Sequence, residues 1–238
     1  ECIKDVETIK SAVIITSDKV YKINKKNISY KELDVLGGAD PYSASKAASE
    51  IVVESYIKSF FKKNKLNNRV STARAGNVLG GGDFAKDRLV PDIIKAINSN
   101  RKIIIRNPDF IRPWQHVLDP LMGYLYLSKK QYENKINNII PAWNFGPDKK
   151  SFKRVIDIVK YLSKLVNFNY EVRKQNTFNE TSILKLNSSK SNKELNWISK
   201  WSLNKALIET INWNNDYKKG FSVRAICEKQ ILMYINNK

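Results

Sequence analysis

Short apolar runs alternate along the chain with longer segments in which apolar residues recur every three or four positions. The first run, "AVIITS" at 12–17, is β-branched and uncharged, which predicts a short buried strand. Three further strands are predicted by "RVSTARAG" (69–76), "KIII" (102–105) and "AWNF" (142–145). Gly76 ends the second of these runs, and a "GPD" turn ends the last.

In the segments between and after these strands, apolar residues recur at helical spacing, which predicts helices. Pro41 is placed to open a helix that runs to about Lys63, and Pro91 lies at the start of another. A further helix is expected at 117–127, and the last third of the chain is mostly helical. The predicted apolar faces are Ala48, Ile51, Val52 and Tyr56; Ile93, Ile94 and Ile97; Val155, Ile158, Val159 and Leu162; Leu203, Ala206, Leu207 and Ile211; and Val223, Ile226, Cys227, Ile231 and Tyr234. Strands that alternate with helices predict an α/β fold with a parallel sheet.

Composition narrows the class of protein. Hydrophobic residues make up 42% of the 238, enough for a sizeable core, and no apolar run approaches the roughly 20 residues of a membrane span. The formal net charge of +19 raises the possibility of a nucleic-acid partner, but the lysines are scattered among asparagines and isoleucines without a basic block. Attraction of an anionic small molecule stays open. Cys2 and Cys227 are too far apart in sequence to suggest a disulfide framework, which favours a cytoplasmic location.

Two groups of polar residues are candidates for chemistry. Ser17, Asp18 and Lys19 lie at and just beyond the end of the first predicted strand, and in parallel sheets ligands bind beyond the carboxyl ends of strands. Tyr42 and Lys46 lie four residues apart at the start of a predicted helix and share one face of it. An ammonium near a phenol favours the phenolate, so such a pair can accept a proton from a substrate hydroxyl. The alternatives are an ordinary polar turn and a pair of surface side chains.

These segments, in order, resemble the extended short-chain dehydrogenase/reductase enzymes that modify nucleotide sugars, and within them the CDP-glucose 4,6-dehydratases. The resemblance spans nearly the whole chain and rests on "TSDKVY", "DPYSASKAASE", "RAGNVLGGGDFAKDRLVPDII", "IRPWQHVLDPLMGYLYL", "WNFGP", "LNW", "WSLNKALIETINW" and "ICEKQI". It implies the C-terminal part of an NAD(P)-binding Rossmann fold with a mixed α/β substrate-binding lobe. It also implies NAD as cofactor, a nucleotide-sugar substrate, a homodimer, and neither a nucleic-acid nor a membrane partner.

The resemblance also assigns roles to residues. It implies that Ser17, Asp18, Lys19, Tyr42 and Lys46 are catalytic, that Tyr42, Lys46 and Asn77 bind the cofactor, that Asn77, Arg88, Arg112 and Asn144 bind the substrate, and that no metal is used. In the implied reaction Tyr42 takes the O4 proton, Asp18 protonates the departing O6, and Lys19 either abstracts the C5 proton or stabilises the enolate. The sole histidine, His116, is expected to be packed or to lie beside the substrate, and Arg112 could instead stack on Trp114. Trp197 and Trp201 are expected in the core.

The family begins with a glycine-rich βαβ unit that binds the NAD pyrophosphate. Nothing before Ala12 could hold it, so we expect a C-terminal portion of a longer enzyme. Residues 1–77 are then the rest of the Rossmann domain, and 78–238 mainly the substrate lobe, with segments near 117–146 returning to the Rossmann domain. "GGGD" at 80–83 is read as a loop, since it lacks the strand–turn–helix context of a phosphate cradle. An epimerase or other dehydratase of the same fold, and a catalytically incomplete nucleotide-sugar-binding fragment, remain alternatives.

Overall fold

The chain forms two compact units, and each is assembled from several stretches of sequence. The structure, a computed structural model, describes residues 1–23, 29–61, 69–136, 140–173 and 183–236. Unit 1 comprises residues 1–76, 119–147 and 185–198, and unit 2 comprises residues 77–118, 148–184 and 199–238. Among the described residues, no helix is long and apolar enough to cross a bilayer.

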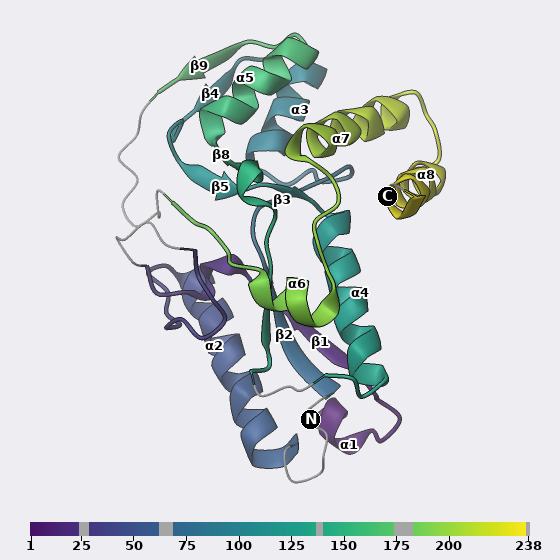
Figure 1. Ribbon diagram of the computed structural model, residues 1–238. Coiled ribbons are helices and arrows are strands. Elements are labelled where there is room, and N and C mark those ends of the chain that lie inside the picture. Colours follow the sequence, from purple (N-terminus) through teal and green to yellow (C-terminus); the bar gives the residue numbers. More distant parts are fainter. Residues whose placement is uncertain (24–28, 62–68, 137–139, 174–182, 237–238) are drawn as a thin grey trace. The chain divides into compact units, whose positions relative to one another are not determined.

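Unit 1 is built on a parallel three-stranded sheet in the order β1-β2-β7. Its strands are β1 (Ala12–Ile15), β2 (Val70–Ala75) and β7 (Ala142–Phe145), which confirms the predicted parallel pairing. Figure 1 shows α2 and α4 on either side of these strands. The helices of this unit are α1 (Cys2–Asp5), a 3-10 turn (Asp18–Val20), α2 (Pro41–Tyr56) continued by a π-helix (Ile57–Phe61), α4 (Leu118–Tyr132), whose first residue belongs to unit 2, and α6 (Ser189–Leu195). The predicted end of the second helix, Lys63, lies outside the described residues.

The first strand is less buried than the sequence predicts. Ile15 is 46% exposed and the rest of β1 is half-buried, whereas Thr16, Ser17 and Asp18 just beyond it are buried. Among the described strands β1 pairs only with β2, so one of its sides has no neighbouring strand there. The polar residues that end the strand are therefore more deeply enclosed than the apolar residues that precede them.

The predicted apolar face of α2 is wrong. Ala48, Ile51 and Val52 are exposed, and the face turned to the interior carries Ser43, Ala47 and Glu50. The helix starts as predicted, with Pro41 at its first position and the Asp40 side chain accepting a hydrogen bond from the Ser43 amide. A polar partner inside the unit explains the reversed face, because Glu50 is held by hydrogen bonds to buried residues.

The core of unit 1 lies between β7, α4 and α6. Trp197 is buried as predicted, and its ring packs edge-on against Phe145 with centroids 5.1 Å apart. Its indole N–H donates to the Asp119 carbonyl at 2.9 Å, so the segment at 185–198 is tied to the start of α4. The buried members of this core are Ala73, Leu127, Ile136, Trp143, Phe145, Leu195 and Trp197.

Unit 2 contains three short strand pairs and four long helices among its described residues. Strands β3 (Val78–Leu79) and β6 (Gln115–His116) pair in parallel, as do β4 (Ile103–Ile105) and β9 (Tyr170–Val172), while β5 (Ile111–Pro113) and β8 (Phe152–Arg154) pair antiparallel. Its helices are α3 (Leu89–Ser99), a 3-10 turn (Lys149–Ser151), α5 (Val155–Leu165), α7 (Leu203–Lys218) and α8 (Val223–Asn236). Of these strands only β4 was predicted, because it is an unbroken run of isoleucines. The others mix polar or proline residues into two or three positions, or are two residues long, and are too short to show a period.

Two of the three predicted C-terminal faces are confirmed. Ile158, Val159 and Leu162 of α5 pack with Leu203, Ala206, Leu207 and Ile211 of α7 in one buried core. The face predicted for α8 is partly wrong, because Val223 and Ile231 are exposed and the buried positions are Ile226, Gln230 and Tyr234. The Gln230 amide donates to the Glu209 carbonyl at 2.7 Å, which accounts for a polar residue on the buried face.

Candidate active site

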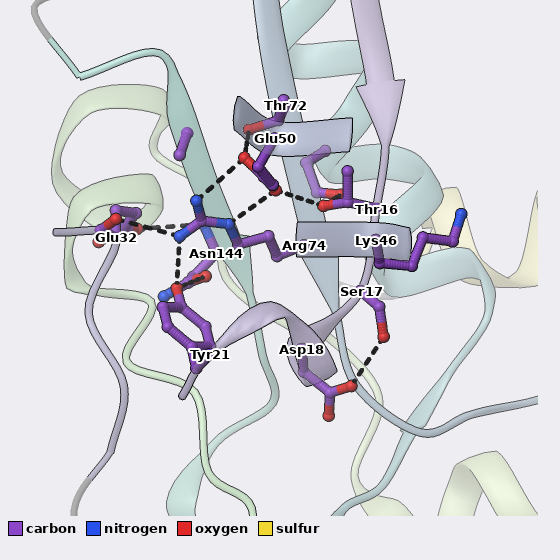
Figure 2. Close-up of polar contacts among 12 residues, drawn as sticks. Thr16, Ser17, Asp18, Tyr21, Glu32, Lys46, Glu50, Thr72, Arg74 and Asn144 are labelled. Atoms are coloured by element: carbon purple, nitrogen blue, oxygen red, sulfur yellow. Dashed lines mark hydrogen bonds and ion pairs between the residues drawn. The ribbon is translucent and has the colours of Figure 1, made fainter. Parts of the chain in front are cut away.

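The polar residues beyond β1 form a tight turn at the carboxyl edge of the unit 1 sheet. The Ser17 hydroxyl lies 3.2 Å from Asp18 Oδ1 and also accepts a hydrogen bond from the Lys19 amide at 3.2 Å. Ser17 and Asp18 are buried, whereas the side chain of Lys19 is exposed. Figure 2 shows the hydroxyl of Ser17 and the carboxylate of Asp18 directed toward each other. Burial raises the pKa of Tyr124 on α4, and the nearby carboxylate of Asp18 raises it further.

Tyr42 and Lys46 lie on α2 beside this turn. Tyr42 is 50% exposed, and the Lys19 ammonium lies over its ring, 5.8 Å from the centroid. Lys46 Nζ lies 3.5 Å from the Ile15 carbonyl, at the last residue of β1. The pKa of Asp40, which caps the helix, is lowered by the Ser43 hydroxyl and amide and also by the charge of Lys19. The structure therefore brings together the five residues for which the sequence predicts a catalytic role.

A buried ionic network lies behind this turn, and the sequence analysis missed it. Arg74 and Glu50 form a two-point ion pair, with Nε to Oε1 at 2.8 Å and Nη2 to Oε2 at 3.0 Å. Arg74 Nη1 also donates to the Tyr21 hydroxyl at 2.8 Å. The Arg74 guanidinium carbon lies over the Tyr21 ring, 4.9 Å from its centroid. Burial opposes the charge of Arg74, but its hydrogen bonds to Glu50 raise its pKa. An arginine inside the otherwise uncharged β2 pattern was a signal for this pair, since a buried charge needs a partner.

Asn144, predicted to bind substrate, is part of the same network. Its side chain is fully buried, with Oδ1 accepting from the Tyr21 hydroxyl at 2.7 Å and Nδ2 donating to the carbonyls of Tyr30 and Asn187. Burial raises the pKa of Tyr21, so the phenol stays protonated and donates to Asn144. Contact between Asn144 and a substrate requires this side chain to exchange its present partners, and the role remains a prediction.

The other three predicted site residues belong to unit 2. The Asn77 carbonyl accepts from the Gln115 amide at 3.1 Å, which joins the start of β3 to β6. Arg88 is exposed and forms an ion pair with Asp83 at 3.0 Å. Arg112 is buried, and its guanidinium lies over the ring of Phe110 at 4.9 Å rather than on Trp114. Arg88 and Arg112 are cations that suit a diphosphate, one exposed and one enclosed.

In the three-glycine turn of unit 2, Gly81 packs directly against a tryptophan. A Cβ built on Gly81 would lie 1.9 Å from Cγ of Trp213, and Gly82 has a positive φ of 78°. The space above these glycines is therefore filled by an indole from α7. Tyr42 and Lys46 are the residues of unit 1 that could meet the ribose and reacting end of a dinucleotide, whereas the turn at 80–83 lacks the strand–turn–helix context of a pyrophosphate cradle.

His116 is packed, which is one of the two placements that the sequence predicts. The ring is buried, its centroid lies 4.6 Å from that of Trp201, and Nδ1 accepts from the Leu118 amide at 3.3 Å. Burial lowers its pKa to about 4, so the imidazole is neutral near pH 7. Within the described part of the chain, no group of three or more His, Cys, Asp or Glu side chains could hold a metal ion.

Sequence comparison identifies the family. The family model described as GDP-mannose 4,6 dehydratase matches residues 1–210, and the chain belongs to this family. Among its relatives, CDP-glucose 4,6-dehydratase of Salmonella typhimurium is 37% identical over 241 residues, which cover 99% of this chain and 67% of that protein. The dTDP-D-glucose 4,6-dehydratase of Dictyostelium discoideum is 28% identical over 151 residues, 59% of this chain and 32% of that protein.

Solved structures show the same fold at low identity. The dTDP-glucose 4,6-dehydratase of Bacillus anthracis, solved in complex with NAD, superposes with a TM-score of 0.72 at 22% identity and covers 88% of this chain. UDP-glucuronic acid 4-epimerase of Bacillus cereus, solved with UDP-glucuronic acid and NAD, gives 0.72 at 19% identity over 86%. The chain spans only 62% and 61% of these two proteins. The fold is thus the Rossmann fold of the extended short-chain dehydrogenase/reductase enzymes, as predicted.

Proposed function

We propose that this chain carries the catalytic residues of an NAD-dependent nucleotide-sugar 4,6-dehydratase that converts CDP-D-glucose to CDP-4-dehydro-6-deoxy-D-glucose and water. The observation that carries the proposal is the meeting of Ser17, Asp18 and Lys19 with Tyr42 and Lys46 at one sheet edge. Cytidine as the nucleobase is supported by the 37% identity with the CDP-glucose enzyme over 99% of the chain.

The residues of unit 1 divide the chemistry between them. Bound NAD would accept a hydride from C4 of the sugar and later return it to C6. Ser17 orients the 4-hydroxyl, and Tyr42 accepts its proton with the help of the Lys46 ammonium. The 4-ketone acidifies the C5 hydrogen, so water can leave across C5 and C6. Asp18 donates the proton to the departing O6, and the exposed Lys19 either removes the C5 proton or stabilises the enolate. A proton returns to C5 when C6 is reduced.

Cofactor and substrate contacts follow the two units. Tyr42 and Lys46 of unit 1, with Asn77, are assigned to the ribose and nicotinamide side of NAD. Arg88 and Arg112 of unit 2 are assigned to the diphosphate of the substrate, supported by their guanidinium groups, and Asn77 and Asn144 are assigned to the remaining substrate contacts. Unit 1 then corresponds to the Rossmann domain, and unit 2 to the nucleotide-sugar lobe.

Assembly and cellular context complete the proposal. The exposed apolar stripe of Ala48, Ile51 and Val52 on α2 supports a homodimer, because such a stripe is costly to leave in water. Cys2 and Cys227 are both free, which supports a cytoplasmic location. The product class, a 4-keto-6-deoxy sugar, places the reaction in the synthesis of deoxysugars for surface polysaccharides such as lipopolysaccharide.

The test separates a dehydratase from a 4-epimerase of the same fold. The purified full chain is incubated with CDP-glucose and NAD, and mass spectrometry follows the loss of one water. We expect Asp18→Asn to reduce water loss by about 100-fold or more, because a general acid contributes a factor of about 10²–10⁴. Asp109→Asn, at an exposed carboxylate of unit 2, serves as control and retains the wild-type rate. An isomeric product without water loss, formed equally well by Asp18→Asn, contradicts the dehydratase assignment and supports an epimerase.

A nucleotide-sugar-binding chain without turnover is the second candidate. It is favoured by the glycine turn at 80–83, which lacks the strand–turn–helix context of a pyrophosphate cradle and whose Gly81 packs on Trp213. Titration calorimetry of the same polypeptide with CDP-glucose and with NAD distinguishes the two. Binding of CDP-glucose without binding of NAD supports the second candidate, and binding of both with water loss supports the enzyme.

A further inference from the structure

Glu50 continues the catalytic face of α2 into the interior of unit 1. Tyr42, Lys46 and Glu50 follow one another at intervals of four residues, so all three lie along one side of the helix. Tyr42 is half exposed, Lys46 is partly buried, and Glu50 is 4% exposed. The helix therefore presents two reactive groups toward the carboxyl edge of the sheet and a buried carboxylate one turn deeper.

The Glu50 carboxylate is surrounded by four donor groups, one from Thr16 just beyond β1 and three from Thr72 and Arg74 on β2. Oε1 accepts from the Thr16 hydroxyl at 2.5 Å and from Arg74 Nε at 2.8 Å. Oε2 accepts from the Thr72 hydroxyl at 2.5 Å and from Arg74 Nη2 at 3.0 Å. Figure 2 shows Glu50 between the two threonines, with Arg74 opposite. Hydrogen bonds to an ionised carboxylate are short and strong, so this group fixes α2 against both strands.

These contacts hold the turn at 17–20 from both ends. Thr16, immediately before Ser17, gives its hydroxyl to Glu50 and its amide to the Ala73 carbonyl at 2.9 Å. Tyr21, immediately after the turn, accepts from Arg74 Nη1, the same side chain that binds Glu50. One ion pair thus anchors the residue before and the residue after the segment that carries Ser17, Asp18 and Lys19.

We propose that Glu50, held by Arg74, is a positioning residue that sets the distance between Tyr42 and Lys46 on α2 and the Ser17–Asp18 turn, and that Thr16 transmits this constraint. The inference rests on the proposed function, since it assigns a purpose to the spacing of those catalytic groups. Proton transfer is sensitive to displacements of about 1 Å, which can cost roughly 10²-fold in rate. The constraint therefore acts on the rate constant and not on substrate affinity.

Two threonines that bond the same carboxylate provide matched variants. Thr16→Val and Thr72→Val each remove one hydroxyl donor to Glu50 from a buried site, but only Thr16 adjoins the turn. We expect Thr16→Val to lower kcat by about tenfold to 100-fold with KM within about threefold, and Thr16→Ser to restore it. Thr72→Val should lose similar thermal stability while kcat falls less than about threefold. Equal losses of kcat in both valine variants overturn the proposal.

Hydrogen exchange of the full chain without substrate gives a reading that does not depend on turnover. Thr16→Val is expected to speed exchange of the Thr16 and Lys19 amides, which bond to Ala73 and Ser17, whereas Thr72→Val leaves them unchanged. Equal exchange at these amides in the two variants contradicts the positioning role. If wild type fails to turn over CDP-glucose but the exchange difference is present, the proposed function fails and the positioning of the turn by Glu50 stands.

Discussion

Gly81 lies against the indole of Trp213, so closely that a Cβ on the glycine would sit 1.9 Å from Cγ of the ring. This contact joins the loop after β3 to α7 within unit 2. It explains the glycine by packing, whereas the sequence had suggested only a loop.

The Gly81 contact predicts a coupled loss of stability. Gly81→Ala is expected to lower the free energy of unfolding by about 1–3 kcal/mol, because the added methyl group displaces a buried ring. In a Trp213→Leu background the same change should cost less, since the smaller side chain leaves room. Chemical denaturation of the four proteins of this cycle measures the coupling. Additive losses in the double variant rule out the direct contact.

Breaking the buried pair of Arg74 and Glu50 should be far more damaging than breaking an exposed one on the same helix. Both side chains of the pair are 3% exposed, so Glu50→Gln leaves a buried guanidinium without its counter-charge and should cost about 3–5 kcal/mol. Glu54→Gln, at the partner of Lys58 one turn further along, should cost less than about 1 kcal/mol, because that pair is 71% and 49% exposed. Urea titrations measure the free energy of unfolding of the two variants. Similar unfolding midpoints would contradict the larger contribution of the buried pair.

His116 should make unit 2 sensitive to acid. Burial lowers its pKa from 6.5 to about 4, so between these values the unfolded chain binds a proton that the folded chain does not. The contribution to the free energy of unfolding is therefore complete above pH 6.5 and declines as the pH falls toward 4, by about 3 kcal/mol in all. His116→Phe, which keeps an aromatic ring beside Trp201, should show a shallower decline over this range. Parallel pH profiles for the two proteins exclude His116 as the source.

Substitutions at Lys19 distinguish a role for its positive charge from a role as a proton acceptor. Its side chain is exposed and its ammonium lies over the Tyr42 ring, so we expect its charge to matter more than its capacity to act as a base. Lys19→Arg keeps a permanent cation and should retain kcat within about tenfold, whereas Lys19→Met should lose about 100-fold. Single-turnover water loss measures both. If the arginine and methionine variants are equally inactive, Lys19 is the C5 base.

Features that local sequence pattern determines were predictable, and features that depend on long-range contacts were not. The parallel strands, the Pro41 helix and the placement of the Ser17 turn near Tyr42 were predictable, because local pattern and the geometry of parallel sheets decide them. The reversed face of α2 was not, because Glu50 gains its stability from Arg74, a residue 24 positions away. Period analysis counts a glutamate as a surface residue and cannot see a partner on another strand.

The short strands of unit 2 illustrate a second limit. Strands β3, β5, β6, β8 and β9 have two or three residues each and take their partners from distant segments. Likewise Gly81 is required because the indole of Trp213 packs against it, and the sequence around either residue does not indicate this contact. Such features depend on tertiary contacts, which a single sequence does not display.

The division of each unit among several stretches of sequence also affects how the chain folds during synthesis. Unit 1 closes only when residues 185–198 arrive, because Trp197 enters its core and Lys190 bonds the carbonyl of Ala142 at the start of β7. Until the ribosome has released this segment, β1 and β2 can pair, but the core of unit 1 stays incomplete while most of unit 2 is already outside. Contacts over such long separations slow folding and expose apolar surface to chaperones. Released, truncated chains that end at residue 184 and at residue 198 should therefore differ sharply in resistance to protease.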